Sequence, residues 1–444
     1  MSDQSSAKRL LKNLASTTVF QASGYVLAMI NVPYLTRTLG VNNFGVLAFV
    51  ISVNAYLFLV IDWGFSLGST RDVAQANGDS EIIRRIFWRT IMAKCLLSAI
   101  AIVALLGVAG FGRVPSPIYL LLPGFLNIIG AIASVDWLVR GLERMGLFTV
   151  YSIGGRAVVV LLTLIFVHGP QDTWLACTLQ GVGCIVSGFA GFIVAYRHLK
   201  MGRPQFPLRA AAVQIIEYRH YFLTQSSWIA YSTAAPLFLT FVAGSAAVGL
   251  FAGADRIARI AMALIEPMSM VLYPRVNALL THSPESAAGI AGLFLALQLI
   301  FASGLTIVFL FGAAPLVALV LGPTFGDAVG VLRWLSALPI LGGIAATLPR
   351  QFLIPLGWSR AVSRITMVTT MAYLLVLPGL CRLMGAEGAA VALIATEGVL
   401  ASSFVALLFI KERPFALASC AAVANTPYRL VAILAMLRVK AGSG

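Results

Sequence analysis

The chain has 444 residues, of which 59% are hydrophobic and 11% are charged, and its mean hydropathy is +0.93. A soluble domain is about half apolar and about a quarter charged, so this composition excludes one. The formal net charge of +15 would suit a nucleic-acid partner as well as a membrane surface, so the positions of the basic residues have to decide between them.

Twelve apolar stretches are long enough to cross a bilayer, whose hydrocarbon core of about 30 Å needs about 20 helical residues. They predict an all-α polytopic membrane protein with about 12 transmembrane helices. The predicted helices are 13–36, 44–69, 87–110, 117–139, 148–168, 174–196, 220–243, 248–274, 288–312, 329–349, 361–384 and 388–410.

The Lys and Arg residues favour one orientation of these helices. With the N-terminus inside the cell, 23 of the 31 fall in cytoplasmic segments, three in external segments and five within predicted helices. The positive-inside rule requires this asymmetry, so both termini are predicted to be cytoplasmic. The excess positive charge then contacts anionic headgroups, and no nucleic-acid partner is expected.

Two lobes of six helices each are predicted, 1–196 and 220–410, joined by a basic cytoplasmic linker at 197–219. Residues 411–444 form a cytoplasmic tail with an interfacial helix in 428–439. Each lobe holds an even number of helices, so a repeat between them would be parallel. Transporters use such repeats, because two bundles can rock about a central cavity.

A shift of 204 positions supports this repeat. A chance register in a biased composition is the alternative. The superposed pairs include Gln21 with Gln225, Gly40 with Gly244, Gly45 with Gly249, Asp62 with Glu266, and Arg71 with Arg275.

Seven ionisable residues fall well within the predicted spans. Each would cost about 2.5–3.5 kcal/mol if it faced lipid, so these side chains are expected to pair or to face water. The seven are Asp62, Arg156, Asp255, Arg256, Arg259, Glu266 and Glu397.

The predicted helix 248–274 is the most highly charged. Asp255, Arg259 and Glu266 share one face at helical spacing, and Arg256 lies beside that face. A buried ion-pair network between helices would explain them. With Arg156, however, the arginines predict a cation-rich cavity for an anionic substrate such as a phosphate or an acidic sugar.

The first predicted helix has amide side chains on or beside its polar face, including Gln21 and Asn31. They suit sugar hydroxyls, although hydrogen bonds between helices would explain them almost as well.

The sequence contains no GxxxxGK[ST] or HExxH motif, and no catalytic residue, metal ligand or cofactor is predicted. No predicted external loop exceeds about 18 residues, which leaves no room for an external catalytic domain. A membrane transporter is therefore expected, and not an enzyme.

Several segments together resemble one known family, the polysaccharide flippases (Wzx or RfbX type) of the multidrug/oligosaccharidyl-lipid/polysaccharide exporter superfamily. These segments are PYLTRTLGVNNFGVLAF, DWGFSLGSTRDVA, VDWLVRGLERM, VLYPR, LGPTFGDAVGVLRWLSALPI, FLIPLG and GAEGAAVALIATE.

This resemblance implies a flippase that moves an undecaprenyl-pyrophosphate-linked oligosaccharide from the inner to the outer leaflet of a bacterial inner membrane. The movement would use alternating access, for O-antigen, capsule or exopolysaccharide synthesis. A polysaccharide polymerase and a chain-length regulator would be the protein partners. The resemblance marks the charged positions Asp62, Arg71, Asp136, Arg140, Glu266 and Glu397 for gating or ion coupling, and the repeat adds Arg275.

Two other functions stay open at this point. A multidrug antiporter of the same fold would favour a cavity dominated by acids, for cationic drugs. A polysaccharide polymerase or ligase would need the long external loop that the sequence lacks.

Overall fold

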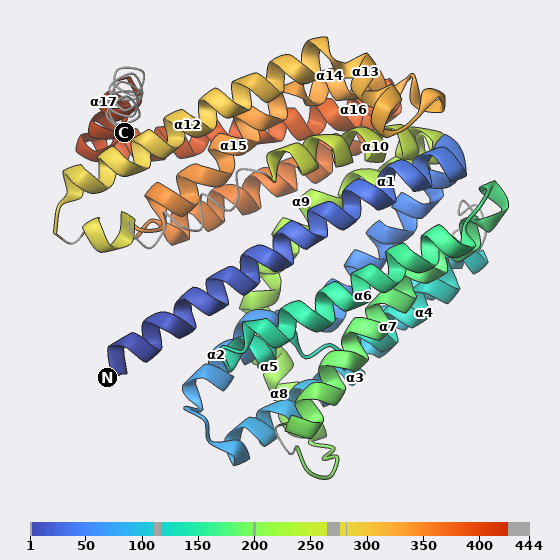
Figure 1. Ribbon diagram of the computed structural model, residues 1–444, viewed down its shortest axis with the longest axis vertical. Helices are drawn as coiled ribbons and strands as arrows, with labels where there is room; N and C mark the ends of the chain where they lie inside the picture. The colour runs from blue at the N-terminus through green and yellow to red at the C-terminus, as the bar shows by residue number, and fades with distance from the viewer. Residues whose placement is uncertain (1, 111–116, 199–200, 264–275, 281, 425–444) are drawn as a thin grey trace, which may run out of the picture. The chain divides into compact units, whose positions relative to one another are not determined.

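The computed structural model describes residues 2–110, 117–198, 201–263, 276–280 and 282–424 (Figure 1). Within these ranges the chain forms α-helices with short 3-10 and π segments, and no strand occurs. Eight described helical stretches are long and apolar enough to cross a membrane. Two of them, Ser16–Gln75 and Ser359–Lys411, have 60 and 53 residues, so each can cross twice. The all-helical polytopic fold is therefore confirmed.

Two predicted hairpins turn at a single glycine without a loop. Helix α1 (Ser2–Asp62) has 61 residues, and only Gly40 leaves helical geometry, with φ 73° and ψ 175°. In α16 (Ser359–Lys411) the corresponding residue is Gly385, with φ 56°. A positive φ is nearly free for glycine, whereas other residues are strained there, so these positions fix where the chain turns.

Helix α8 lies in the predicted linker and was not predicted, whereas the other helices of this part match the predicted spans with two corrections. The prediction of one continuous helix over 44–69 is wrong. Trp63 (φ 44°) and Gly64 (φ 84°) break the helix after Asp62. The predicted helix 117–139 is broken at 134–135. The elements are α2 (Phe65–Gln75), α3 (Ser80–Gly110), α4 (Pro117–Ala133), α5 (Asp136–Gly141), α6 (Met145–Phe166), η1 (Pro170–Asp172), α7 (Thr173–His198), α8 (Leu208–Glu217), α9 (Arg219–Val242) and α10 (Gly244–Met262).

The C-terminal part adds helices that hydropathy did not separate. The predicted helix 329–349 is interrupted by a 3-10 turn, and α17 was not predicted. The predicted interfacial helix 428–439 and the end of the predicted helix 248–274 lie outside the described residues. The elements are α12 (Pro284–Phe311), α13 (Ala313–Val320), η2 (Pro323–Phe325), α14 (Ala328–Trp334), η3 (Leu335–Ala337), α15 (Leu338–Leu348), η4 (Pro349–Leu353), α16 and α17 (Arg413–Ala424).

The described chain divides into two compact units. The first contains Met1–Gly253, Ala318–Gly326 and Cys381–Ala386, and the second contains the remainder. In the first unit, Phe65, Phe87 and Trp137 lie in a buried core that also includes Ala211 of α8. The second unit has its own core around Phe352 and Phe404. The functional lobes 1–196 and 220–410 stay a prediction.

The glycine pairs of the sequence repeat have matching structural roles. Gly40 (φ 73°) and Gly244 (φ 83°) are both left-handed, and they are 204 positions apart. A Cβ on Gly45 would overlap the Ser245 carbonyl oxygen, and a Cβ on Gly249 would overlap the Val41 carbonyl oxygen. Since Val41 and Ser245 are also 204 positions apart, the contact is reciprocal, as in an interface between two copies of one surface.

Candidate functional site

Arg156 lies between α6 and α1 and is held by an aromatic ring. Its guanidinium carbon is 4.4 Å from the centroid of the Phe20 ring. Gly24 makes room for it, because a Cβ there would lie only 2.6 Å from Arg156 Nη1. The side chain is exposed, and no carboxylate of the described residues forms an ion pair with it. Its guanidinium thus stacks on a ring, and Asp136 acts on it electrostatically without forming an ion pair.

A second arginine is stacked beside the first. Arg140 of α5 lies over Phe148 of α6, 4.8 Å from the ring centroid, and Phe148 packs on Phe20 with centroids 4.7 Å apart. The two rings thus lie between two arginines, both exposed. We call Phe20, Asp136, Arg140, Phe148, Tyr151 and Arg156 the cation–aromatic site.

Asp136 anchors the buried side of this site. Its Oδ1 accepts a hydrogen bond of 2.7 Å from the hydroxyl of Tyr151, whose ring lies edge-on to Phe148 at 5.8 Å. Local sequence explains the arrangement. Arg140 is one helical turn after Asp136 on α5, and Tyr151 is one turn after Phe148 on α6, so each pair shares a helix face.

The stacking leaves both arginines able to bind an anion. A cation–π contact contributes about 0.5–2 kcal/mol and occupies one face of the planar guanidinium. The N–H groups lie at the edge of that plane and remain suited to a forked bond with phosphate or carboxylate oxygens.

The two amides predicted on α1 are incompletely bonded. Gln21 Oε1 and Asn31 Oδ1 are buried, and neither has a hydrogen-bond partner among the described residues. A buried polar atom without a partner costs about 1–3 kcal/mol. Both oxygens can therefore accept a bond from water or a ligand hydroxyl.

Asp62 is buried, and neutral groups bind its carboxylate. Only 3% of Asp62 is exposed. Its Oδ2 accepts bonds from Gln225 Nε2 (3.3 Å) and from the backbone N–H of Ser66 (3.4 Å), and Ser66 Oγ donates to Gln225 Oε1 (3.2 Å). The described contacts thus join Asp62 to α2 and α9, and none joins it to the cation–aromatic site.

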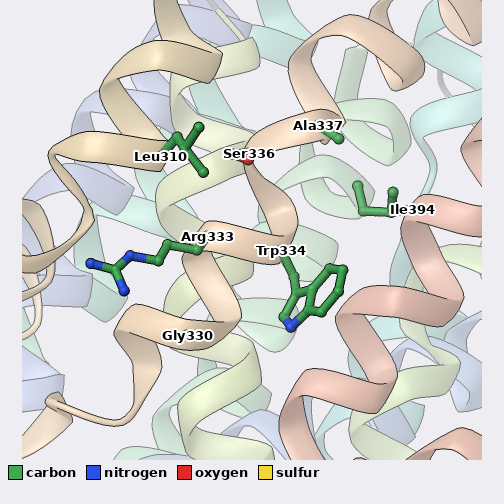
Figure 2. Close-up of a pocket in the computed structure, with 7 residues that line it drawn as sticks. All are labelled: Leu310, Gly330, Arg333, Trp334, Ser336, Ala337 and Ile394. Atoms are coloured by element: carbon green, nitrogen blue, oxygen red, sulfur yellow. The ribbon is translucent and has the colours of Figure 1, made fainter.

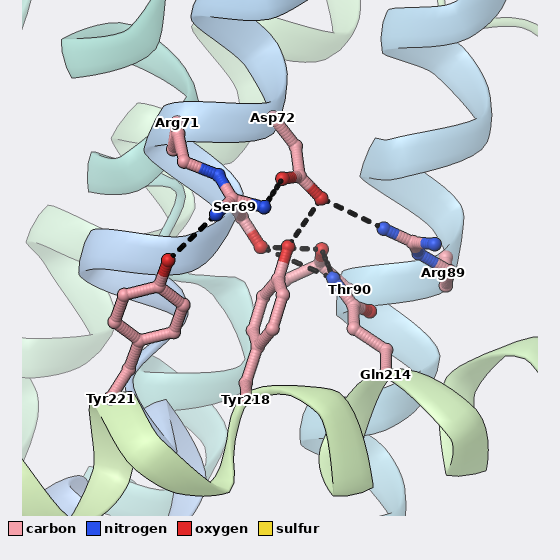
Figure 3. A network of polar contacts seen from close by, with 8 residues as sticks. All are labelled: Ser69, Arg71, Asp72, Arg89, Thr90, Gln214, Tyr218 and Tyr221. Atoms are coloured by element: carbon pink, nitrogen blue, oxygen red, sulfur yellow. Dashed lines mark hydrogen bonds and ion pairs between the residues drawn. The ribbon is translucent and has the colours of Figure 1, made fainter.

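Arg71 belongs to a larger polar network, drawn in Figure 3. Its Nη1 donates to the Tyr221 hydroxyl (3.0 Å) and its Nη2 lies 3.3 Å from Asp72 Oδ1. Asp72 Oδ2 also contacts Arg89 Nη2 (3.1 Å) and accepts a bond from the Tyr218 hydroxyl (2.5 Å). The sequence analysis selected Arg71 and missed Asp72, because the contacts of Asp72 with Arg89 and Tyr218 join different helices.

This network ties the predicted linker to the first helices. Gln214 of α8 donates to Ser69 Oγ (3.3 Å) and Thr90 Oγ1 (3.1 Å), next to the Asp72 contacts (Figure 3). Burial and the hydrogen bond to Asp72 raise the pKa of Tyr218 to about 12, so its hydroxyl stays a donor at neutral pH.

In the second unit, the predicted pair of α10 is formed. Arg259 Nε lies 2.7 Å from Asp255 Oδ2, and Arg256 is exposed beside it. Glu397 lies against Gly342, where a Cβ would be 3.4 Å from its Oε1 and 3.3 Å from the Met262 methyl. Glu266 and Arg275 lie outside the described residues.

The second unit also contains a cavity of about 460 Å³ that the sequence did not predict. Trp334 is held there by a 3.2 Å bond from its Nε1 to Glu387 Oε2. Figure 2 shows Arg333 extending away from Trp334. Most of the residues that line the cavity are apolar. The lining residues are Leu310, Gly330, Arg333, Trp334, Ser336, Ala337 and Ile394.

Membrane-spanning helices with breaks, and with arginines between them, are the architecture of a membrane transporter. Known structures have the same fold. The chain matches a structure described as "Lipid II flippase MurJ, inward closed conformation" with a TM-score of 0.65 at 12% identity, covering 95% of this chain and 92% of that one. It matches an inward-facing multidrug resistance MATE family transporter with a TM-score of 0.63 at 17% identity, covering 89% and 96%.

Sequence comparison shows the family. Residues 10–279 match the family of polysaccharide biosynthesis proteins, and the chain belongs to this family. Two relatives bear the name "Putative O-antigen transporter". The one from Escherichia coli (strain K12) is 28% identical over 407 residues, covering 91% of this chain and 97% of the relative. The one from Shigella dysenteriae is 26% identical over 386 residues, covering 87% and 96%. The chain is thus a multi-pass protein of the bacterial inner membrane. It is a Wzx-type member of the multidrug/oligosaccharidyl-lipid/polysaccharide exporter superfamily.

Proposed function

We propose that this protein flips an undecaprenyl-pyrophosphate-linked oligosaccharide from the inner to the outer leaflet of the bacterial inner membrane. The observation that carries the proposal is the pair of exposed arginines, Arg140 and Arg156, stacked on two touching aromatic rings. The names of the two relatives support a polysaccharide precursor as cargo.

The chemistry of this site suits such a cargo. A diphosphate carries several acceptor oxygens, and two guanidinium edges offer forked donors to them. Phe20 and Phe148 add apolar surface beside the arginines, on which a sugar ring can pack. The free oxygens of Gln21 and Asn31 can accept bonds from sugar hydroxyls.

Alternating access is supported by the reciprocal contact of Gly45 and Gly249. Gly45 and Gly249 each follow a glycine turn of the repeat, Gly40 or Gly244, by five residues. The charge distribution predicts that these turns lie on the external side of the membrane. Backbone contact without side chains can close this end tightly and separate without losing packed side chains. We infer that it closes while the cargo enters from the cytoplasm. Asp62 and Glu397 are then the coupling acids, and a polymerase and a chain-length regulator receive the released cargo.

The test is deletion of the gene followed by measurement of where the lipid-linked oligosaccharide accumulates. Accumulation in the inner leaflet, reversed by the wild-type gene, supports the proposal. The Arg156→Ala gene should fail to reverse it. Arg85→Ala is the matched control, because Arg85 is 73% exposed and pairs only with Glu81 among the described residues. Drug sensitivity without any glycan defect would support a multidrug antiporter instead.

A further inference from the structure

Lys94 of α3 is buried completely, and the mechanism above does not use it. Its exposed fraction is 0%. The ammonium group donates to three oxygens, Ala131 O at 3.1 Å, Ser134 O at 2.7 Å and Ser134 Oγ at 3.3 Å. An ammonium has three donors, so the three partners satisfy it fully.

These oxygens lie at the break between α4 and α5. Helix α4 ends at Ala133 and α5 begins at Asp136, with Val135 between them at φ −121°. The last carbonyls of a helix lack helical partners and carry a partial negative charge, so a cation is favourable there. Lys94 thus holds the chain where it changes direction, two residues before Asp136.

The charge of Lys94 also needs an explanation. None of the described carboxylates lies within ion-pair distance of it. Asp62 and Asp136 act on it electrostatically. These two acids are the ones predicted for gating or ion coupling in this unit. A buried cation carries a large desolvation penalty, and an apolar residue of similar volume would avoid it.

We propose that Lys94 is the positioning residue of the cation–aromatic site. It fixes the α4–α5 break, and thereby aims Asp136 at Tyr151 and Arg140 at Phe148. This inference rests on the proposed function only where it treats the cation–aromatic site as the diphosphate site.

The test is a double-mutant cycle with Lys94→Met and Asp136→Asn, using undecaprenyl diphosphate in lipid vesicles as the probe. We expect each single variant to weaken binding about tenfold or more, as loss of a charged hydrogen bond does. If Lys94 acts through Asp136, the double variant should bind about as well as the weaker single variant. Effects that multiply would overturn the inference.

A second cycle needs no ligand. Melting temperatures are measured for the full-length wild type, the two single variants and the double variant. The decrease in the double variant should differ from the sum of the decreases in Lys94→Met and Asp136→Asn. A lysine that only fills the core would couple to Ser134→Ala and be additive with Asp136→Asn. If Lys94→Met does not fold, Lys94→Gln replaces it, because its amide keeps a donor for the carbonyls.

The controls separate the two proposals. Gln298→Leu removes a buried amide of the second unit that bonds Thr347, so it should lower the melting temperature without changing binding. If wild-type protein does not bind undecaprenyl diphosphate, the proposed function fails and the stability cycle still decides the role of Lys94. If wild-type protein binds and both cycles are additive, only the inference about Lys94 fails.

Discussion

Two arginines predicted for the substrate cavity, one in each unit, differ in how their charge is balanced. In the first, Arg156 stacks on Phe20 and has no ion-pair partner among the described carboxylates. In the second, Arg259 is 2.7 Å from Asp255. An arginine on an aromatic face keeps its charge and its N–H edge available, whereas an ion pair neutralises the charge and occupies the edge. Counting arginines along helices therefore does not locate an anion site.

The first prediction concerns the arginine with no acid partner. Arg156→Ala should weaken binding of undecaprenyl diphosphate about 100-fold, because hydrogen bonds to charged groups contribute about 1.5–3 kcal/mol each. Arg156→Lys should bind with intermediate affinity, since it keeps the charge and loses the fork. Equilibrium binding in vesicles measures both. If Arg259→Ala weakened binding more than Arg156→Ala, the contrast between these two arginines would be wrong.

The second prediction uses what the two repeats share. Gly45→Ala and Gly249→Ala should impair export to a similar extent, because each Cβ would overlap a backbone carbonyl of the other repeat. Overpacking costs about 1–3 kcal/mol, which corresponds to about a 5- to 160-fold loss of the closed state. Rates of glycan export in a deletion strain measure it. Gly289→Ala is the control, because nothing lies within 4 Å of a Cβ there. Unequal effects would argue against a reciprocal contact.

The sequence predicted the all-helical polytopic fold because apolar length is a local signal, whereas the orientation of the termini stays a prediction. It also located Gly40 and Gly244, since a repeat of 204 positions is visible in the sequence. It did not predict the breaks at Trp63 and at 134–135, because a break depends on the backbone conformation of one or two residues, which the hydropathy of a whole span does not record.

Charge partners were harder to predict than helices. The spacing of Asp255 and Arg259 predicted their ion pair, because both lie on one helix. Arg156 with Phe20, and Lys94 with Ala131, are contacts between different helices, and one sequence holds no record of how helices are rotated against each other.

The third prediction concerns an acid shared by two arginines. Asp72 contacts Arg71, Arg89 and the hydroxyl of Tyr218. Tyr218→Phe removes one hydrogen bond to a carboxylate that is 20% exposed, so we expect a loss of about 1.5 kcal/mol in the free energy of unfolding. Thermal or denaturant unfolding in detergent measures it. An unchanged stability would show that the two arginines alone hold Asp72.

The same bond should depend on pH. The pKa of Tyr218 is about 12 in the folded protein, against about 10 in an unfolded chain. The stabilisation is thus fully present below pH 10, and it is lost as the pH rises through about 12. The unfolding midpoint of Tyr218→Phe should fall less steeply than that of the wild type over this range.

The smallest effect is expected at the ion pair of the second unit. Arg259→Ala should lower the free energy of unfolding by about 1 kcal/mol or less, because Arg259 is 38% exposed and solvent screens the pair. Binding of the diphosphate should change less than it does with Arg156→Ala, since Asp255 already neutralises this arginine. Asp255→Asn would remove that neutralisation. An increase in diphosphate affinity in Asp255→Asn, abolished by adding Arg259→Gln, would show that the partner of an arginine decides whether it can bind the cargo. No change in affinity would mean that Arg259 lies away from the path of the anion, whatever its charge.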